Sequence, residues 1–136
     1  MTGTPHSSTP VRRILALLAE DTDIAEAEAA DAQELLTAAD LYASDRGIAM
    51  NDVRRLALAA HGLAFVRRVR AHEYPPELDR GLYDEVGAER FEEVRSLLTA
   101  YCADRAHTVT DPEVLLLTLH FEAALQEDSS PPGHRV

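Results

Sequence analysis

The sequence predicts an all-α protein, a compact bundle of about five helices. The chain is rich in Ala and Leu, which have high helix propensity, and it has few β-branched runs. No segment of useful length alternates between apolar and polar residues as a half-buried strand does. Its 136 residues, 46% of them hydrophobic, suffice for one domain with a core that needs no disulfide or metal.

The first two expected helices begin at recognisable start signals. Thr9 and Pro10 suit the N-cap and first position of a short helix that continues through Glu20. A second helix, from about 24 to 44, opens on a run of Asp and Glu, which favours the positive end of the helix dipole, and it ends before Gly47. One side of this second helix carries Leu35, Ala39 and Tyr42.

Two further helices are apolar on most sides. One begins at Asn51 as its N-cap and reaches about residue 71, and the last begins at Thr110 or Asp111 and reaches about residue 127. Because their apolar residues point in nearly every direction, we expect both helices to be central and largely enclosed. In the first of the two these residues are Val53, Leu56, Leu58, Leu63, Phe65, Val66 and Val69.

Between these helices, Pro75 and Pro76 break the helical pattern. A short helical turn is expected within 78–86, followed by a helix over about 88–105. The apolar stripe of that helix consists of Phe91, Val94, Leu98, Tyr101 and Cys102. The remaining ends, residues 1–9 and 128–136, are rich in Ser, Thr, Pro and Gly, which predicts disordered tails on a helical domain of residues 11–127.

Composition excludes several classes of function. The formal net charge is −11 and all 13 basic residues are Arg, so an acidic chain without a basic patch is not expected to bind nucleic acid directly. Cys102 is the only cysteine, which excludes an internal disulfide and a multi-cysteine metal cluster. No uncharged apolar run approaches the ~20 residues that span a bilayer, so we expect a cytoplasmic protein that does not enter the membrane.

His61 and His120 occupy the two most apolar stretches of the chain. Burying a polar group without a partner costs about 1–3 kcal/mol on protein mutational scales. A shared hydrogen-bond network, a metal, or chemistry on the imidazole itself would offset that cost.

Charged residues recur around each histidine at intervals of seven. Arg54, His61 and Arg68 share one narrow helical stripe, because residues seven apart lie within about 20° of each other around the axis. The small residues Ala57 and Ala64 between them leave room beside the imidazole. Something that requires positive charge therefore fits next to His61.

The last helix repeats this spacing with Glu113, His120 and Glu127. A charged residue two turns away is roughly 10 Å along the axis, too far for a bond within one helix but within reach from a neighbouring helix. A buried Arg68 would need a carboxylate, and Glu113 is the natural candidate.

Other interpretations of the histidines stay open from spacing alone. Both could be structural, in a passive helical dimerisation or interaction module. Metal binding by His61, His120 and a Glu is weakly supported, since no H-x-x-x-H spacing is present, and no cofactor is indicated. Nucleophile and phosphate-loop motifs are absent from the sequence, so we do not expect an enzyme. The other histidines are expected to be solvated surface residues: His6, His72, His107 and His134.

Two motifs resemble those of the phosphotransferase-system regulation domain (PRD). Residues 61–68, H-x-L-A-F-V-x-R, resemble the first signature of that family, in which an arginine follows the histidine by seven residues. Residues 111–124, D-P-E-V-L-L-L-T-L-H-F-E-A-A, resemble the second, in which an acidic residue precedes an apolar run that ends in T-L-H. The resemblance extends over roughly residues 11–127.

This resemblance implies a five-helix bundle that forms a homodimer and accepts phosphate on His61 and His120. The implied donors are the phosphocarrier protein or a sugar-permease IIB component. A phosphoryl group of about −1.5 to −2 charge would recruit Arg68, which matches the family arginine, and Arg54, which follows from spacing alone. The expected function is regulation of transcription or sugar utilisation.

Two features depart from the family pattern. Ala60 stands where many members have an Asp before the first histidine, which removes an orienting partner for His61. The chain also carries one such module without an attached nucleic-acid-binding domain. We therefore expect a separate effector protein to receive the signal.

Overall fold

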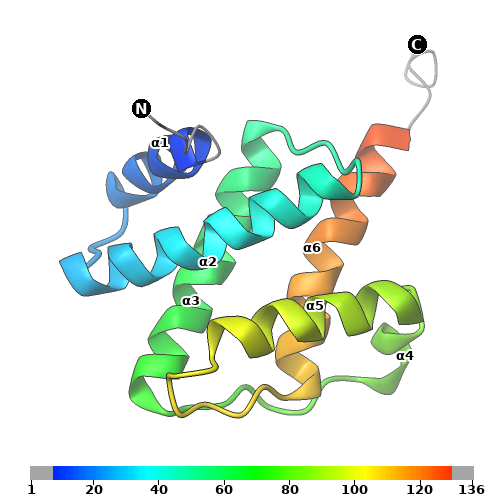
Figure 1. The fold of residues 1–136 in the computed structure, drawn as a ribbon. Coiled ribbons are helices and arrows are strands. Elements are labelled where there is room, and N and C mark those ends of the chain that lie inside the picture. Colours follow the sequence, from blue (N-terminus) through cyan, green and yellow to red (C-terminus); the bar gives the residue numbers. More distant parts are fainter. Residues whose placement is uncertain (1–7, 130–136) are drawn as a thin grey trace.

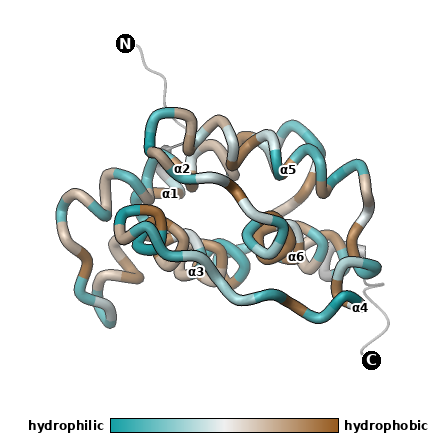
Figure 2. The backbone as a smooth tube through the Cα atoms, turned by 90° about the horizontal axis from the view of Figure 1, so that it is seen from below, coloured by the Kyte–Doolittle hydropathy of each residue, from teal (hydrophilic) through white to brown (hydrophobic). Residues whose placement is uncertain are grey.

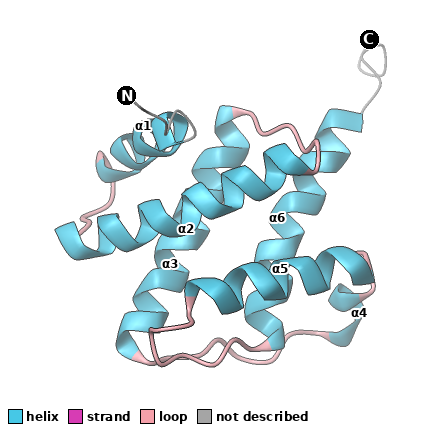
Figure 3. Ribbon diagram, viewed as in Figure 1, coloured by secondary structure: helices cyan, strands magenta, loops and turns pink. Residues whose placement is uncertain are grey.

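The computed structural model describes residues 8–129, and within this range the chain forms helices joined by turns and loops, without strands (Figures 1 and 3). The helices are α1 (Ser8–Ala19), α2 (Glu26–Asp45), α3 (Asp52–Ala71), α4 (Arg80–Tyr83), α5 (Ala88–Tyr101) and α6 (Asp111–Ser129). The predicted all-α bundle is confirmed, with six helices rather than five if the single turn α4 is counted.

Two pairs of helices form the body of the molecule. In the view from below, α2 and α5 lie on one side and α3 and α6 on the other, while α1 packs against α2 and α3 (Figure 2). The helices α3 and α6 run in opposite directions (Figure 1). This arrangement places the middle of α3 beside the middle of α6.

The core is built from aliphatic side chains, as the composition indicates. The two largest fully buried side chains are Phe65 of α3 and Phe121 of α6. Gly62 allows α3 to approach α2 closely, because a Cβ at this position would lie 3.1 Å from Cδ2 of Leu36. Leu35 and Ala39 of α2 are buried, as their shared side of the helix predicts.

The N-terminal half of α3 is less enclosed than predicted. Val53 is 70% exposed and Leu56 is 39% exposed. Together with the exposed Ala60 and Ala64 they form an apolar stripe, defined here as residues 53, 56, 60 and 64. The cause is geometric: α1 and α2 cover one side of α3 and α6 covers another, which leaves the remaining side open. The expectation for α6 is confirmed, since most of its apolar residues are buried.

Helix boundaries differ from the predictions by a few residues. The N-cap Asn51 is confirmed, because its side chain accepts a hydrogen bond from the backbone N–H of Arg54 at 2.8 Å. The helix predicted over 88–105 ends at Tyr101, where turns begin and lead to Ala106 in the left-handed region (φ 54°). Residues 8–9 and 128–129 belong to helices rather than to the predicted tails, and the rest of both tails lies outside the described residues.

None of the helices within residues 8–129 combines the length and the apolar character needed to cross a lipid bilayer.

Candidate functional site

The antiparallel packing of α3 and α6 brings His61 and His120 face to face. The centroids of the two imidazole rings are 5.0 Å apart, and the ring planes are inclined by 40°. Both side chains are half-buried. The two histidines that the sequence predicts as functional, 59 positions apart by their numbers, thus form one site, which we call the histidine pair.

Burial keeps both rings uncharged at neutral pH. Desolvation, aided by the nearby His120 and by the positive charge of Arg68, lowers the pKa of His61 to about 3. Desolvation also lowers the pKa of His120, with a further contribution from the charge of Arg54. A neutral imidazole keeps an unshared electron pair on one ring nitrogen. Each histidine can therefore act as a nucleophile at neutral pH.

Arg68 lies beside the histidine pair with unused hydrogen-bond donors. Its Nε and Nη2 atoms are buried and have no hydrogen-bond partner. Its charge is also close enough to lower the pKa of His61. Buried guanidinium donors of this kind are suited to bind an oxyanion, to which arginine donates charge-assisted hydrogen bonds.

Arg54 lies near the other end of the same stripe of α3, two helical turns before His61. Because α6 runs antiparallel to α3, the charge of Arg54 acts on His120 rather than on His61. The predicted stripe therefore supplies one arginine near each ring. Glu127, which shares the seven-residue spacing in α6, has a side chain outside the described part of the structure.

The predicted pairing of Glu113 with Arg68 is wrong. Glu113 is fully buried, and its Oε1 accepts hydrogen bonds from the backbone N–H of Thr110 at 2.8 Å and from the Thr110 hydroxyl at 3.0 Å. Its Oε2 lies 2.7 Å from Nε2 of His107. The reason is that Glu113 is the third residue of α6, where its carboxylate closes a capping box with Thr110. The T-x-x-E spacing of residues 110–113 is the sequence signal for this role.

His107, expected on the surface, is instead buried in the core. Its side chain is 0% exposed, and its ring stacks on Tyr74 with centroids 4.4 Å apart and planes inclined by 13°. The ring of Phe65 meets it edge-on at 5.9 Å. No local pattern marks His107, because Phe65 and Tyr74 belong to distant segments. His72 is exposed as expected, while His6 and His134 lie outside the described residues.

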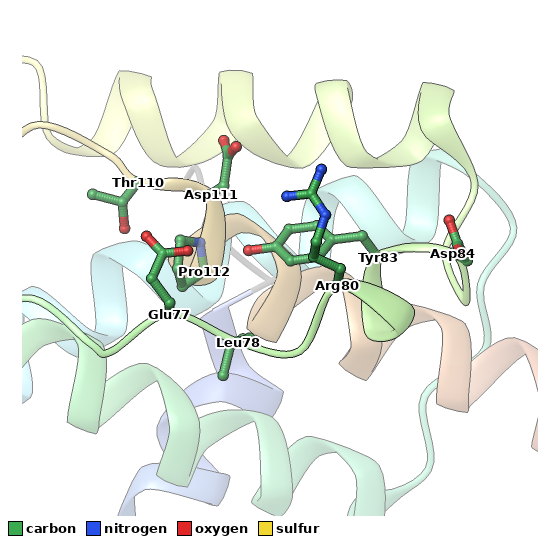
Figure 4. A pocket seen from close by; sticks show the side chains of 8 residues that line it. All are labelled: Glu77, Leu78, Arg80, Tyr83, Asp84, Thr110, Asp111 and Pro112. Carbon is green, nitrogen blue, oxygen red and sulfur yellow. The ribbon is translucent and has the colours of Figure 1, made fainter.

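Other parts of the surface do not extend the histidine pair. Within residues 8–129, no three His, Cys, Asp or Glu side chains come together in a way that could hold a metal ion. An open hollow of about 490 Å³ lies between the segment around α4 and the start of α6, where Arg80 and Tyr83 reach toward Asp111 and Pro112 (Figure 4). Neither histidine of the pair lines this hollow.

Comparison of the chain with protein families, with curated proteins and with solved structures gave no match. The fold and the histidine pair are therefore interpreted from the residues of this chain alone.

Proposed function

We propose that this protein is a regulatory module of the sugar phosphotransferase system that accepts phosphate on His61, His120 or both. The observation that carries the proposal is the pair of imidazole rings at 5.0 Å beside the unpartnered donors of Arg68. Neutral rings supply the nucleophile, and the guanidinium supplies the charge that a phosphoryl group requires.

The motifs that resemble the PRD signatures support the same function. They come from opposite parts of the chain, and their histidines meet across α3 and α6. The donor in this proposal is the phosphocarrier protein or a sugar-permease IIB component in the cytoplasm. The protein itself is not an enzyme in this scheme: phosphorylation changes how it binds a separate effector protein that controls transcription or sugar utilisation.

A homodimer gives the phosphoryl group a structural consequence. The exposed apolar stripe at residues 53, 56, 60 and 64 lies on α3 close to His61 and suits a self-complementary contact with a second copy. A phosphoryl group at the edge of such an apolar contact weakens it by desolvation and charge repulsion, or strengthens it by recruiting an arginine of the partner. Either change transmits the phosphorylation state to the effector.

The test is phosphorylation of the purified chain with phosphoenolpyruvate and the general phosphotransferase proteins, analysed by mass spectrometry at neutral pH. We expect acid-labile phosphate on His61 or His120, and none on the His61→Gln/His120→Gln variant. If the wild-type chain takes up no phosphate from a cognate donor, the function is that of a passive helical interaction module. The exposed apolar stripe favours this second candidate, in which the histidines are structural.

A further inference from the structure

The two imidazole rings are too close to be independent phosphorylation sites. Their centroids are separated by 5.0 Å, and within the described part of the chain neither ring is held by a hydrogen bond or an ion pair. A group bonded to a nitrogen of one ring therefore lies within reach of the other ring. The same two arginines also serve both rings.

The charge at the site matches one phosphoryl group. Each group adds about −1.5 to −2 charge, and Arg54 and Arg68 together supply two positive charges. Two groups would place about twice that negative charge around the same two guanidinium groups. Because both histidines are half-buried, water and salt screen this repulsion less than they do at an exposed surface.

We infer that His61 and His120 form a single phosphoacceptor site, which holds one phosphoryl group at a time on either ring. This inference rests on the proposed function and specifies its regulation. The protein then has two states, empty and singly phosphorylated. A second donor cannot add to the first, and loss of one histidine leaves the other able to accept phosphate.

The transfer can be written with an inorganic donor, phosphoramidate, whose phosphorus is bonded to nitrogen. The unshared pair of a ring nitrogen forms the new N–P bond as the P–N bond of phosphoramidate breaks. Ammonia leaves with that electron pair, and the ring keeps its hydrogen on its second nitrogen. In His120 the attacking atom is Nε2, because Nδ1 is buried without a partner.

The experiment counts phosphoryl groups on the folded chain after saturation with phosphoramidate. It uses a background in which His6, His72 and His134 are replaced by Gln, so that only the pair and the buried His107 remain. The His61→Gln/His120→Gln variant in the same background gives the baseline. Intact mass is measured at neutral pH, where phosphohistidine survives.

We expect the background chain to take up one group above the baseline, and each single variant, His61→Gln or His120→Gln, also to take up one. Phosphorus–proton NMR should locate the group on Nε2 in the chain that retains only His120. Uptake of two groups by the background chain, failure of either single variant to react, or phosphate on Nδ1 of His120 would overturn the inference.

The failure of this inference and that of the proposed function are distinguishable. Two groups on the background chain would leave the proposed function standing and exclude only the single-site scheme. No uptake above the baseline, by any chain, would remove both. The count on the background chain needs no substitution in the histidine pair, so misfolding of a single variant does not decide the result.

Discussion

The histidines of this protein differ in how the fold compensates for their burial. His107 has a buried carboxylate at 2.7 Å, whereas His61 and His120 have only each other and nearby arginines. The first arrangement satisfies the ring and fixes the loop that carries it. The second lowers the pKa of both rings and leaves them neutral and reactive. At the scale of single residues, structural and reactive histidines are thus distinguished by their partners.

The lowered pKa of His61 predicts a loss of stability in mild acid. The pKa is about 3 in the folded chain, against 6.5 for an unperturbed histidine, so the unfolded chain binds the proton first as the pH falls. The stabilisation is complete above the unfolded value and is lost as the pH falls toward the folded value. Relative to His61→Gln, the wild-type chain should lose about 2 kcal/mol between about pH 7 and about pH 5. Urea unfolding of both chains measures this difference, and parallel pH profiles would contradict it.

The unpartnered donors of Arg68 predict its role in holding phosphate. Arg68→Ala should shorten the lifetime of phosphohistidine at position 61, and Arg54→Ala should act mainly on position 120. Arg55→Ala is the matched control on the same helix, since the Arg55 guanidinium binds Asp40 at 3.1 Å and the carbonyl oxygen of Met50 at 2.7 Å. Hydrolysis followed by mass spectrometry at neutral pH gives the lifetimes. An equal effect of Arg55→Ala would show that the stripe of arginines has no specific role.

The buried His107–Glu113 contact predicts strong energetic coupling. Glu113→Leu should destabilise the fold by about 3–5 kcal/mol, because it leaves the ring without its partner and removes the carboxylate that caps α6. In the double variant with His107→Leu no buried polar ring remains, so its cost should be below the sum of the two single costs. Urea denaturation of the four chains provides the cycle. Additive costs would mean that the contact contributes little.

The sequence predicts the reactive residues better than the structural ones. His61, His120, Arg54 and Arg68 can be found because their spacing of seven within a helix is local information. The partner of Glu113 cannot, because it depends on a loop that places His107 against Tyr74 and Phe65. Long-range contacts of this kind leave no periodic trace in the sequence.

At the scale of the helices, start signals and apolar spacing predict which segments are helical but not how far each is covered. Asn51 begins α3 as predicted. The apolar residues around the whole circumference of α3 indicate a central helix, yet Val53 and Leu56 are exposed. Hydrophobicity reports which surfaces can be buried, and the positions of neighbouring helices decide which of them are buried within one chain.

The close contact between α2 and α3 at Gly62 predicts a specific packing effect. Gly62→Ala should destabilise the chain by about 1 kcal/mol, because the added Cβ meets the buried Leu36 at 3.1 Å and this outweighs the gain in helix propensity. In a Leu36→Ala background the obstacle is absent, and the same substitution should stabilise by up to about 1 kcal/mol. Thermal or urea unfolding of the four chains tests the change of sign. Stabilisation in both backgrounds would exclude the steric explanation.

For the whole molecule, net charge and the exposed apolar stripe act against each other. A formal charge of −11 on each chain opposes self-association, whereas burial of residues 53, 56, 60 and 64 favours it. Since α3 carries both this stripe and His61, the proposed homodimer and the histidine pair share one helix. A small change of charge there can therefore shift the balance between monomer and dimer.

This balance predicts that salt strengthens the proposed homodimer. The Debye length falls from about 30 Å at 0.01 M salt to about 3 Å at 1 M, so repulsion between the acidic chains is screened while the apolar contact remains. Sedimentation velocity over a concentration series should show tighter association at high salt. Val53→Glu combined with Leu56→Glu should abolish it, whereas Leu41→Glu, at an exposed position of α2, should leave association at high salt nearly unchanged. A strict monomer at every salt concentration, or equal sensitivity to Leu41→Glu, would mean that the apolar stripe of α3 does not join two copies.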